Sequence, residues 1–324
     1  MRVLMSPGPK ISNPFIALLI DNLDPDIDVT AFSWREAFLG HYDVLHVHWP
    51  DALLKAPTPA RRVLKFLQLR ALMLRNRMRG VRQVWTVHNL TPHEDGGGLR
   101  ARALAAWDRS CTNHVFLSQA AVEIAGSRDG TVIKHGDYND IREAHSDRVV
   151  PSVPGELLLF GLLRPYKGIE TLVDAVTAQD QLHLRILGRP EPSSYAESLL
   201  RHTDRAAGVE LEFGRVDDAD LVEAITRAEA VVLPYQKIYN SGAALMALTL
   251  GRPIIVTDSG TMRELRAEVG SDWVYCLEGP LTADSLGTAV AALRGSERAD
   301  RPTFTERDWA TIGRAYSNVY RRTA

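Results

Sequence analysis

The sequence predicts an α/β fold made of two domains. Short apolar runs, the pattern of buried strands, alternate through most of the 324 residues with segments whose apolar residues recur at helical spacing. Alternation of strands with helices implies crossover connections and therefore parallel sheets. Because the chain is about twice the commonest length of a single-core domain, two domains are expected.

Each half of the chain contains six expected strands. Those of the first half are Arg2–Ser6, Asp28–Phe32, Asp43–His48, Gln83–His88, His114–Ser118 and Thr131–Lys134. Those of the second half are Glu156–Gly161, Leu182–Leu187, Val209–Phe213, Ala230–Pro234, Pro253–Thr257 and Trp273–Leu277. Asn13 and Pro14 fit a helix cap and a first helical residue, which predicts a helix over Phe15–Leu23. An amphipathic helix is predicted over Thr305–Arg322.

Residues 146–155 are the expected boundary between the domains. They include Pro151, Pro154 and Gly155, and a predicted strand begins directly after them. We therefore expect one domain over residues 1–150, a second over 151–304 and a last helical segment over 305–324. The carboxyl ends of the two sheets would face a cleft, where folds of this kind bind ligands.

The composition excludes several classes of protein. Apolar residues make up 45% and charged residues 24% of the chain, which is typical of a globular protein and not of a disordered or fibrous one. The net charge of −2 by itself argues against a polyanion-binding protein. Residues 52–93, however, contain nine cations and no acidic residue, so the rest of the chain carries −11.

The cysteines and the apolar runs indicate the compartment. Cys111 and Cys276 have neither disulfide-framework nor metal-site spacing, and they favour a reducing cytoplasm. The first residues lack the apolar core of a signal peptide, and no apolar run approaches the roughly 18 residues that span a bilayer. We expect a cytoplasmic protein, either in solution or peripheral on the inner face of the membrane.

A loop after a predicted strand carries the strongest local signal for ligand binding. The strand ends at Gly161, the loop contains Arg164 and Lys167, and a helix begins near Gly168. Glycine lets a ligand approach the backbone, and two cations beside a helix N-terminus suit a diphosphate. The alternative is an ordinary strand–loop–helix unit with two solvated cations.

A second candidate is the turn at Ser241 and Gly242. These residues fit a cap that opens an apolar helix, whose first amides would be free to bind an anion. Residues 251–253 end that helix and begin the next strand. Taken alone, this stretch is explained better by the ordinary turn residues between a helix and a strand of an α/β protein than by an anion site.

In their order along the chain, these motifs resemble those of glycosyltransferases with the GT-B fold, closest to family four. The loop after Gly161 is followed by a strand ending at Gly188, by Phe213–Val216, and by the Leu-Pro-Tyr, Ser-Gly, Gly-Arg-Pro and Gly-Thr-Met-Arg-Glu motifs. The resemblance spans most of residues 156–268, with weaker echoes in the N-terminal half. It implies two Rossmann-like domains facing a cleft, with a C-terminal helix that crosses back to the N-terminal domain.

The resemblance also implies that the C-terminal domain binds a nucleotide-sugar donor. No metal or other cofactor is expected, because the resembled fold works without a bound metal. The residues matching the family's donor contacts are Arg164 and Lys167 at the diphosphate, Gly188 and Val216 at the nucleobase and ribose, and Ser241 and Gly242 at the phosphates.

One departure from the family concerns two glutamates. Members commonly place them eight residues apart, the second five residues before the glycine that ends the helix. Counting back from Gly251, those positions are occupied by Ile238 and Met246. The chain therefore resembles a divergent subgroup that includes bacterial exopolysaccharide mannosyltransferases. Glu264 either supplies a replacement carboxylate or simply begins a helix.

Histidines gather at the ends of two predicted strands in the N-terminal half. His46 and His48 share one face, and His88, His93 and Glu94 follow the next strand. Such a cluster also fits a metal site, but the resembled fold argues against one. In the family, the position of His88 faces the donor sugar. Candidate general bases for an inverting reaction are Asp51, His93 and Glu94.

Two further positions resemble loops of the family that line the cleft. His135 follows the predicted strand Thr131–Lys134, and Asn13 lies in the first strand–helix turn. The family uses the latter loop to meet acceptor or donor phosphate.

The basic segment predicts a helix over Pro59–Gly80. Four cations share one sector of a helical wheel: Arg61, Lys65, Arg75 and Arg79. Four apolar residues share the opposite sector: Val63, Leu67, Leu74 and Met78. We expect the cations to face an anionic membrane, at about 1 kcal/mol each. The alternative is a solvated helix packed on the sheet. Nucleic acid is not an expected partner, because aromatic platforms and a recognition motif are absent.

Together these features predict a glycosyltransferase that moves a sugar from a nucleotide-sugar to a lipid-linked or polysaccharide acceptor. Resemblance to the subgroup makes GDP-mannose the first candidate donor, with UDP-sugars as the alternative. Two other classes stay open, namely a nucleotide-sugar epimerase of the same fold and a non-catalytic nucleotide-sugar sensor.

Overall fold

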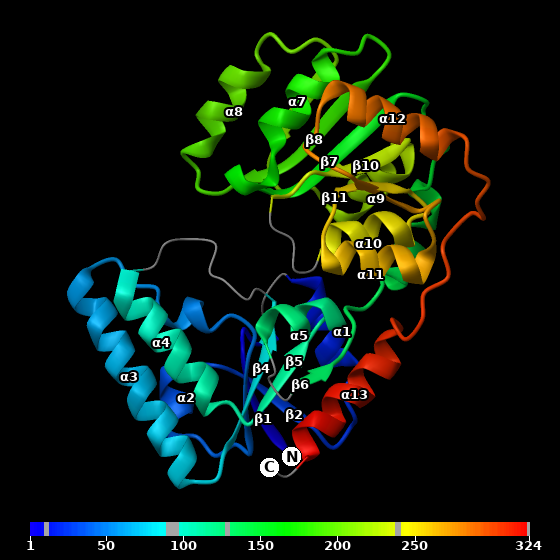
Figure 1. The fold of residues 1–324 in the computed structure, drawn as a ribbon. Coiled ribbons are helices and arrows are strands. Elements are labelled where there is room, and N and C mark those ends of the chain that lie inside the picture. The colour runs from blue at the N-terminus through cyan, green and yellow to red at the C-terminus, as the bar shows by residue number, and fades with distance from the viewer. Residues whose placement is uncertain (10–12, 89–96, 127–129, 237–240, 323–324) are drawn as a thin grey trace. The chain divides into compact units, whose positions relative to one another are not determined.

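The computed structural model describes residues 1–9, 13–88, 97–126, 130–236 and 241–322. The chain forms two compact units (Figure 1). Unit 1 contains Met1–Gly136 together with Glu306–Ala324, and unit 2 contains Asp137–Thr305. Each unit is an α/β domain around one parallel sheet of six strands, which confirms the predicted fold class.

The sheet of unit 1 has the strand order β2-β1-β3-β4-β5-β6. Its strands are β1 (Arg2–Ser6), β2 (Asp28–Ala31), β3 (Val44–Val47), β4 (Arg82–Val87), β5 (Asn113–Phe116) and β6 (Gly130–Val132). Its helical elements are α1 (Pro14–Asp21), α2 (Trp34–Leu39), η1 (Pro50–Leu54), α3 (Pro59–Met78), α4 (Gly97–Ser110), α5 (Gln119–Ala125) and α13 (Trp309–Arg321). Helices on both faces bury the central strands, so these strands read as continuous apolar runs.

Two hydrophobic clusters cover the two faces of this sheet. One contains Leu45 and Trp85 from the strands with Leu72 of α3 and Trp107 of α4. The other combines strand residues such as Val44 with side chains of α1 and α13. The sheet of unit 1 is thus sandwiched between α3 and α4 on one side and α1 and α13 on the other.

The last helix, α13, belongs to unit 1 although unit 2 precedes it in the chain. It packs against α1 (Figure 1), and a Cβ atom on its Gly313 would overlap the carbonyl oxygen of Asn22. Asp308 caps its first turn by accepting a hydrogen bond from the amide of Thr311 at 2.8 Å. Because glycine allows so close an approach, α13 lies directly on α1.

The sheet of unit 2 has the order β12-β11-β10-β7-β8-β9. Its strands are β7 (Glu156–Leu163), β8 (His183–Pro190), β9 (Val209–Phe213), β10 (Ala230–Leu233), β11 (Ile254–Thr257) and β12 (Val274–Leu277). Its helical elements are α6 (Asn139–Ala144), η2 (Ser146–Arg148), η3 (Pro165–Lys167), α7 (Ile169–Thr177), α8 (Tyr195–Thr203), α9 (Asp218–Arg227), α10 (Gly242–Thr249), α11 (Gly260–Val269) and α12 (Ala283–Arg294). All its strands lie where the sequence predicted them, but β7 and β8 extend further than expected.

The boundary between the units is not the one predicted from the sequence. Residues 146–155 do not link two domains, because their backbone is bonded within unit 2. The amide of Val153 donates to the carbonyl of Arg227 at 2.8 Å, and the amide of Val150 donates to Thr226 Oγ1 at 3.2 Å. Pro151 and Pro154 therefore belong to an extended segment that is bonded to the end of α9. The division falls instead at Gly136 and Asp137.

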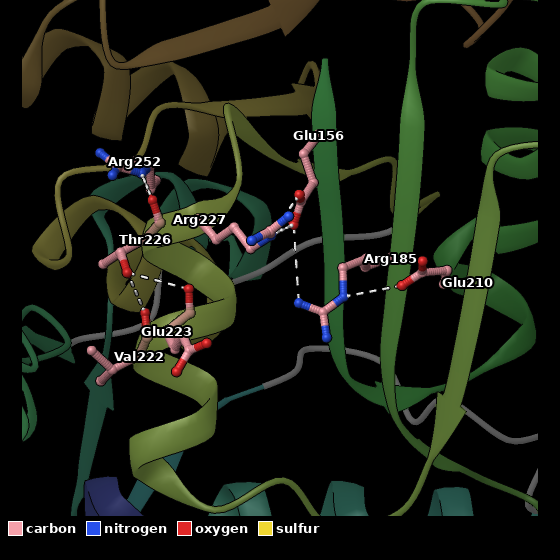
Figure 2. A network of polar contacts seen from close by, with 8 residues as sticks. All are labelled: Glu156, Arg185, Glu210, Val222, Glu223, Thr226, Arg227 and Arg252. Carbon is pink, nitrogen blue, oxygen red and sulfur yellow. Dashed lines mark hydrogen bonds and ion pairs between the residues drawn. The ribbon is translucent and has the colours of Figure 1, made fainter. Parts of the chain in front are cut away.

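A network of polar contacts holds this part of unit 2 together (Figure 2). Arg227 Nε donates to both carboxylate oxygens of Glu156, at 3.0 and 2.8 Å. Arg252 Nε donates to the carbonyl of Thr226 at 2.6 Å, and its Nη2 donates to the carbonyl of Val150 at 3.2 Å. Glu156 begins β7, so the network lies at the amino end of that strand.

Candidate functional site

Glycines meet at the carboxyl ends of adjacent strands in unit 2. Gly161 of β7 and Gly188 of β8 are direct partners in the sheet register. Both have positive φ angles, 102° and 151°, and a Cβ atom on Gly188 would overlap the carbonyl oxygen of Gly161. Gly214 follows β9 with φ 148° and donates its amide to the carbonyl of Gly188 at 3.0 Å. A bare backbone surface therefore lies at this edge, where parallel sheets bind ligands.

Lys167 lies beside this surface as a buried cation. Its side chain is only 8% exposed, and Nζ lies 4.6 Å from the centre of the Tyr235 ring. A Cβ atom on Gly161 would lie 3.7 Å from Nζ. Among the described residues, no carboxylate pairs with this ammonium group. Burial, and then the charge of Arg164, lower the pKa of Lys167 to about 7.

Arg164 does have a carboxylate partner, which the sequence analysis missed. Its Nη2 and Nε donate to one carboxylate oxygen of Glu191, at 2.6 and 3.2 Å. Glu191 directly follows β8, and both side chains are partly exposed. The two predicted diphosphate cations therefore differ, because Arg164 is neutralised by a neighbour and Lys167 is not.

The turn before α10 has the predicted form. Ser241 caps the helix, its Oγ accepting a hydrogen bond from the amide of Ala244 at 3.1 Å. Gly242 is the first helical residue, so its amide is among those that have no partner within the helix. On the neighbouring strand end, the buried hydroxyl of Tyr235 finds no hydrogen-bond partner in the described part of the chain.

The other donor-side residues occupy less distinctive positions. Val216 follows β9 and packs, partly buried, against a hydrophobic cluster of unit 2. Glu264 lies in the second turn of α11, so it does not begin that helix. Met246, at one of the missing glutamate positions, is buried in the core. Ile238, at the other, lies outside the described residues.

In unit 1, two histidines pair at the ends of neighbouring strands. His48 follows β3 and His88 follows β4, and His48 Nδ1 lies 3.0 Å from His88 Nε2. The ring of Trp49 stacks on that of His88, with centroids 4.4 Å apart. Burial lowers the pKa of His88 to about 3, with smaller contributions from His135 and His46. Burial also lowers the pKa of His48, so both imidazoles are neutral and one donates to the other.

His46 anchors a buried network to the C-terminal helix. Its Nδ1 lies 2.7 Å from the hydroxyl of Tyr320, and its Nε2 lies 2.8 Å from Thr86 Oγ1. The same Thr86 oxygen lies 3.0 Å from the hydroxyl of Tyr316. Burial lowers the pKa of His46 to about 3, so this ring is also neutral. The network holds the histidine-bearing end of β3 against α13.

Two further predicted cleft residues have clear local roles. His135 Nδ1 donates to the carbonyl of Gly136 at 2.8 Å, and burial lowers the pKa of His135 to about 4. Asn13 caps α1, its Oδ1 accepting a hydrogen bond from the amide of Phe15 at 3.0 Å. Phe15 in turn contacts the rings of His48, His88 and His135.

One of the three candidate bases lies within the described residues. Asp51 lies in η1, a short helical turn soon after the end of β3, and one of its oxygens accepts a hydrogen bond from Arg100 Nη2 at 2.8 Å. Its side chain is 28% exposed. His93 and Glu94 lie outside the described residues. In the described part of the chain, no three His, Cys, Asp or Glu side chains are grouped so as to hold a metal ion.

The four cations predicted to face a membrane differ in their exposure to solvent. Arg75 is buried, donating to the carbonyls of Phe38 and Gly40 at 3.0 and 2.7 Å, so this prediction is wrong. Lys65 is half-buried over the ring of Trp34. Arg61 and Arg79 are exposed as expected. The cationic sector reaches toward α2, whereas the apolar sector with Leu67 and Met78 faces solvent.

Several residues of the candidate site were not predicted from the sequence. Glu191 directly follows β8, Trp49 directly follows His48, and Tyr316 and Tyr320 lie on the buried stripe of α13, but none of them was assigned to the site. Gly214 was part of a recognised motif but was not assigned to the site.

Comparisons with known proteins indicate the family. Residues 154–293 match the family model described as Glycosyl transferases group 1. A GDP-mannose:glycolipid 4-beta-D-mannosyltransferase of Xanthomonas campestris pv. campestris is 35% identical over 311 residues, covering 95% of this chain and 88% of the relative.

Solved structures agree on the fold. AviGT4, a glycosyltransferase involved in avilamycin A biosynthesis, is 17% identical with a TM-score of 0.63, covering 99% of this chain and 97% of that protein. Anabaena Alr3699/HepE in complex with UDP-glucose is 16% identical with a TM-score of 0.62, covering 98% and 94%. Among the described residues, no helix is long and apolar enough to span a bilayer.

Proposed function

This chain belongs to the group 1 glycosyl transferases, and we propose that it transfers mannose from GDP-mannose to a glycolipid acceptor. The substrates rest on similarity to the Xanthomonas mannosyltransferase over nearly the whole chain. The structural observation that supports the proposal is Lys167, a buried cation beside the backbone of Gly161 that has no carboxylate partner among the described residues. Such a group favours an anion of high charge density.

The GDP leaving group carries negative charge, and this accounts for the cations and free amides at the strand ends of unit 2. When the bond between mannose C1 and the diphosphate oxygen breaks, its electron pair stays on GDP. We assign Lys167, Arg164 and the first amides of α10 to the stabilisation of that charge. Arg164 would exchange Glu191 for the diphosphate, and the backbone of Gly188 would let the nucleotide approach the sheet.

The acceptor side of the reaction needs a base. The name of the relative specifies a β-linked product, and the mannose of GDP-mannose is α-linked, so its reaction inverts the configuration at C1. In a single displacement the acceptor oxygen bonds to C1 while its proton passes to a base. We propose Asp51, because it is a partly exposed carboxylate at a strand end, whereas burial holds His88 neutral and poorly basic.

A glycolipid acceptor also implies a membrane surface. We propose that the protein is peripheral on the inner face of the membrane and that α3 contacts the lipid. Support comes from the exposed apolar stripe of α3, which contains Val63, Leu64, Leu67, Leu74 and Met78. The free thiols Cys111 and Cys276 fit the reducing side of that membrane.

The test is a panel of GDP- and UDP-sugars with a detergent-solubilised glycolipid acceptor. We expect GDP release and a mannosylated lipid with GDP-mannose alone, and a β linkage by the coupling constant at C1. Asp51→Asn should lower kcat about 100-fold or more without changing the affinity for GDP-mannose.

Other outcomes would replace the proposal. Epimerisation of a free nucleotide-sugar would identify an epimerase, and tight binding without turnover would identify a sensor. If Asp51→Asn keeps full activity, the base must lie elsewhere, and the candidates outside the described residues, His93 and Glu94, would be tested next.

A further inference from the structure

A large basic cavity lies in unit 1 at the opposite edge of the sheet from the histidines. Its volume is about 1000 Å³, and it is lined by the end of α3, the beginning of β4 and the end of α4. Five arginines line it: Arg70, Arg77, Arg79, Arg82 and Arg109. Because this edge holds the amino ends of the strands, the cavity is separate from the candidate catalytic residues.

Within the described residues, the arginines of this cavity outnumber its carboxylates five to one. In the part of the chain that the structure describes, Arg70, Arg77, Arg79 and Arg109 form no ion pair, and all four are exposed. The lining contains one carboxylate, Asp43, and its Oδ2 accepts a hydrogen bond from the amide of Arg2 at 2.7 Å. Several unpaired guanidinium groups around one cavity constitute a site for a multiply hydrogen-bonding anion such as a phosphate.

The cavity adjoins the exposed apolar stripe of α3. Leu74 belongs to both, since it lines the cavity and is 58% exposed. The stripe runs the length of α3, about 30 Å for its 20 residues. Arg70 and Arg77 line the cavity together with Arg109 of α4, and α4 packs against α3 (Figure 1). An amphipathic helix of this kind lies with its apolar face about 5–10 Å into the boundary between headgroups and acyl chains.

We propose that this cavity binds the phosphate of an anionic phospholipid headgroup, anchoring unit 1 to the membrane away from the catalytic residues. The inference rests on the proposed function, because the glycolipid acceptor brings the protein to a bilayer. With Leu67 and Met78 below the headgroups, Arg77 at the flank of the stripe lies at the level of the lipid phosphates. Arg109 of α4 approaches the same phosphate from the other wall of the cavity.

The experiment measures partition of the full chain onto vesicles. The vesicles are phosphatidylcholine, with or without about one part in four of phosphatidylglycerol. We expect binding to the anionic vesicles and an about 30-fold loss in the double variant Arg77→Gln, Arg109→Gln, the effect of two cations at an anionic surface. The control Arg205→Gln, Arg314→Gln removes two exposed cations far from the cavity in sequence and should keep the binding.

Short-chain phosphatidylglycerol below its micellar concentration tests the cavity without a bilayer. Calorimetry should detect its binding to the unaltered chain and not to the Arg77, Arg109 double variant. Equal heats with inorganic phosphate alone would mean that the site takes a free anion, which overturns the lipid assignment. Equal loss of vesicle binding in both double variants would also overturn it, because net charge would then suffice.

Sedimentation and mannosyl transfer distinguish a failure of the lipid site from self-association of the chain and from a failure of the proposed function. Sedimentation should show a monomer in solution, since self-association through α3 without vesicle binding would assign the stripe to a second copy of the chain. Mannosyl transfer in detergent tests the enzymatic function independently. Loss of transfer with intact vesicle binding would count against the function and leave the lipid site standing.

Discussion

Replacing Lys167 by methionine should stabilise the protein while weakening its affinity for the nucleotide-sugar. Moving the pKa of a lysine from 10.5 to about 7 corresponds to about 5 kcal/mol of unfavourable free energy of folding. Methionine fills a similar volume, so Lys167→Met should raise the unfolding free energy by about 5 kcal/mol below pH 7, or the Tm of unit 2 by about 10–20 °C.

The stabilisation expected from Lys167→Met depends on pH. Below pH 7 the lysine is charged in both folded and unfolded chains, and the whole penalty of burying the charge applies. Between pH 7 and about 10 the folded chain carries a neutral lysine and the unfolded chain a charged one, so the penalty shrinks. The stabilisation by Lys167→Met should therefore be largest below pH 7 and nearly absent near pH 10.

The assay is thermal unfolding of Lys167→Met and of the exposed control Lys55→Met across this pH range. Calorimetry with GDP-mannose accompanies it. Because a diphosphate restores the charge of Lys167, the unaltered chain should take up a proton on binding at pH 8, and Lys167→Met should bind about tenfold more weakly or worse. A variant that is destabilised at every pH, or stabilised by the same amount at every pH, would refute the reasoning.

Three other substitutions test the contacts of the candidate site. Glu191→Gln frees Arg164 and should tighten GDP-mannose binding by about tenfold, whereas weaker binding in titration calorimetry would mean that the carboxylate contacts the nucleotide-sugar. Tyr320→Phe leaves His46 Nδ1 unpaired in the core and should cost about 1–3 kcal/mol in denaturant unfolding, and an unchanged midpoint would contradict the network. Gly188→Ala forces a Cβ atom onto the facing strand and should cost more than about 3 kcal/mol, so a soluble variant with normal stability would disprove the close approach.

The sequence was sufficient to predict the strands, because each is a local apolar run bounded by turn residues. Val209–Phe213, for example, was predicted to the residue and is β9. The glycine–cation loop after β7 was equally readable, since the backbone freedom of Gly161 and the charge of Lys167 are properties of the residues themselves. Helix caps such as Asn13 and Ser241 are also local, because each bonds an amide two or three residues away.

Burial and pairing, in contrast, were decided by the tertiary structure. The helical wheel separated a cationic from an apolar sector of α3, but it contained no information on which sector meets the sheet. Arg75 is buried because carbonyls at the end of α2 accept its hydrogen bonds, and Leu67 is exposed because other apolar residues of α3 already fill the core. Prolines likewise predicted extended chain at residues 146–155, but the partners on α9 made that chain part of unit 2.

The same distinction holds for the functional groups. The sequence by itself determined that two cations follow β7 and that histidines end β3 and β4. Only the tertiary structure decided that Glu191 neutralises Arg164 while Lys167 meets no carboxylate among the described residues, and that tyrosines of α13 hold His46. The physical reason is that a charge or a ring nitrogen acquires its energy from neighbours distant in sequence, whereas strands and caps acquire theirs from residues close by.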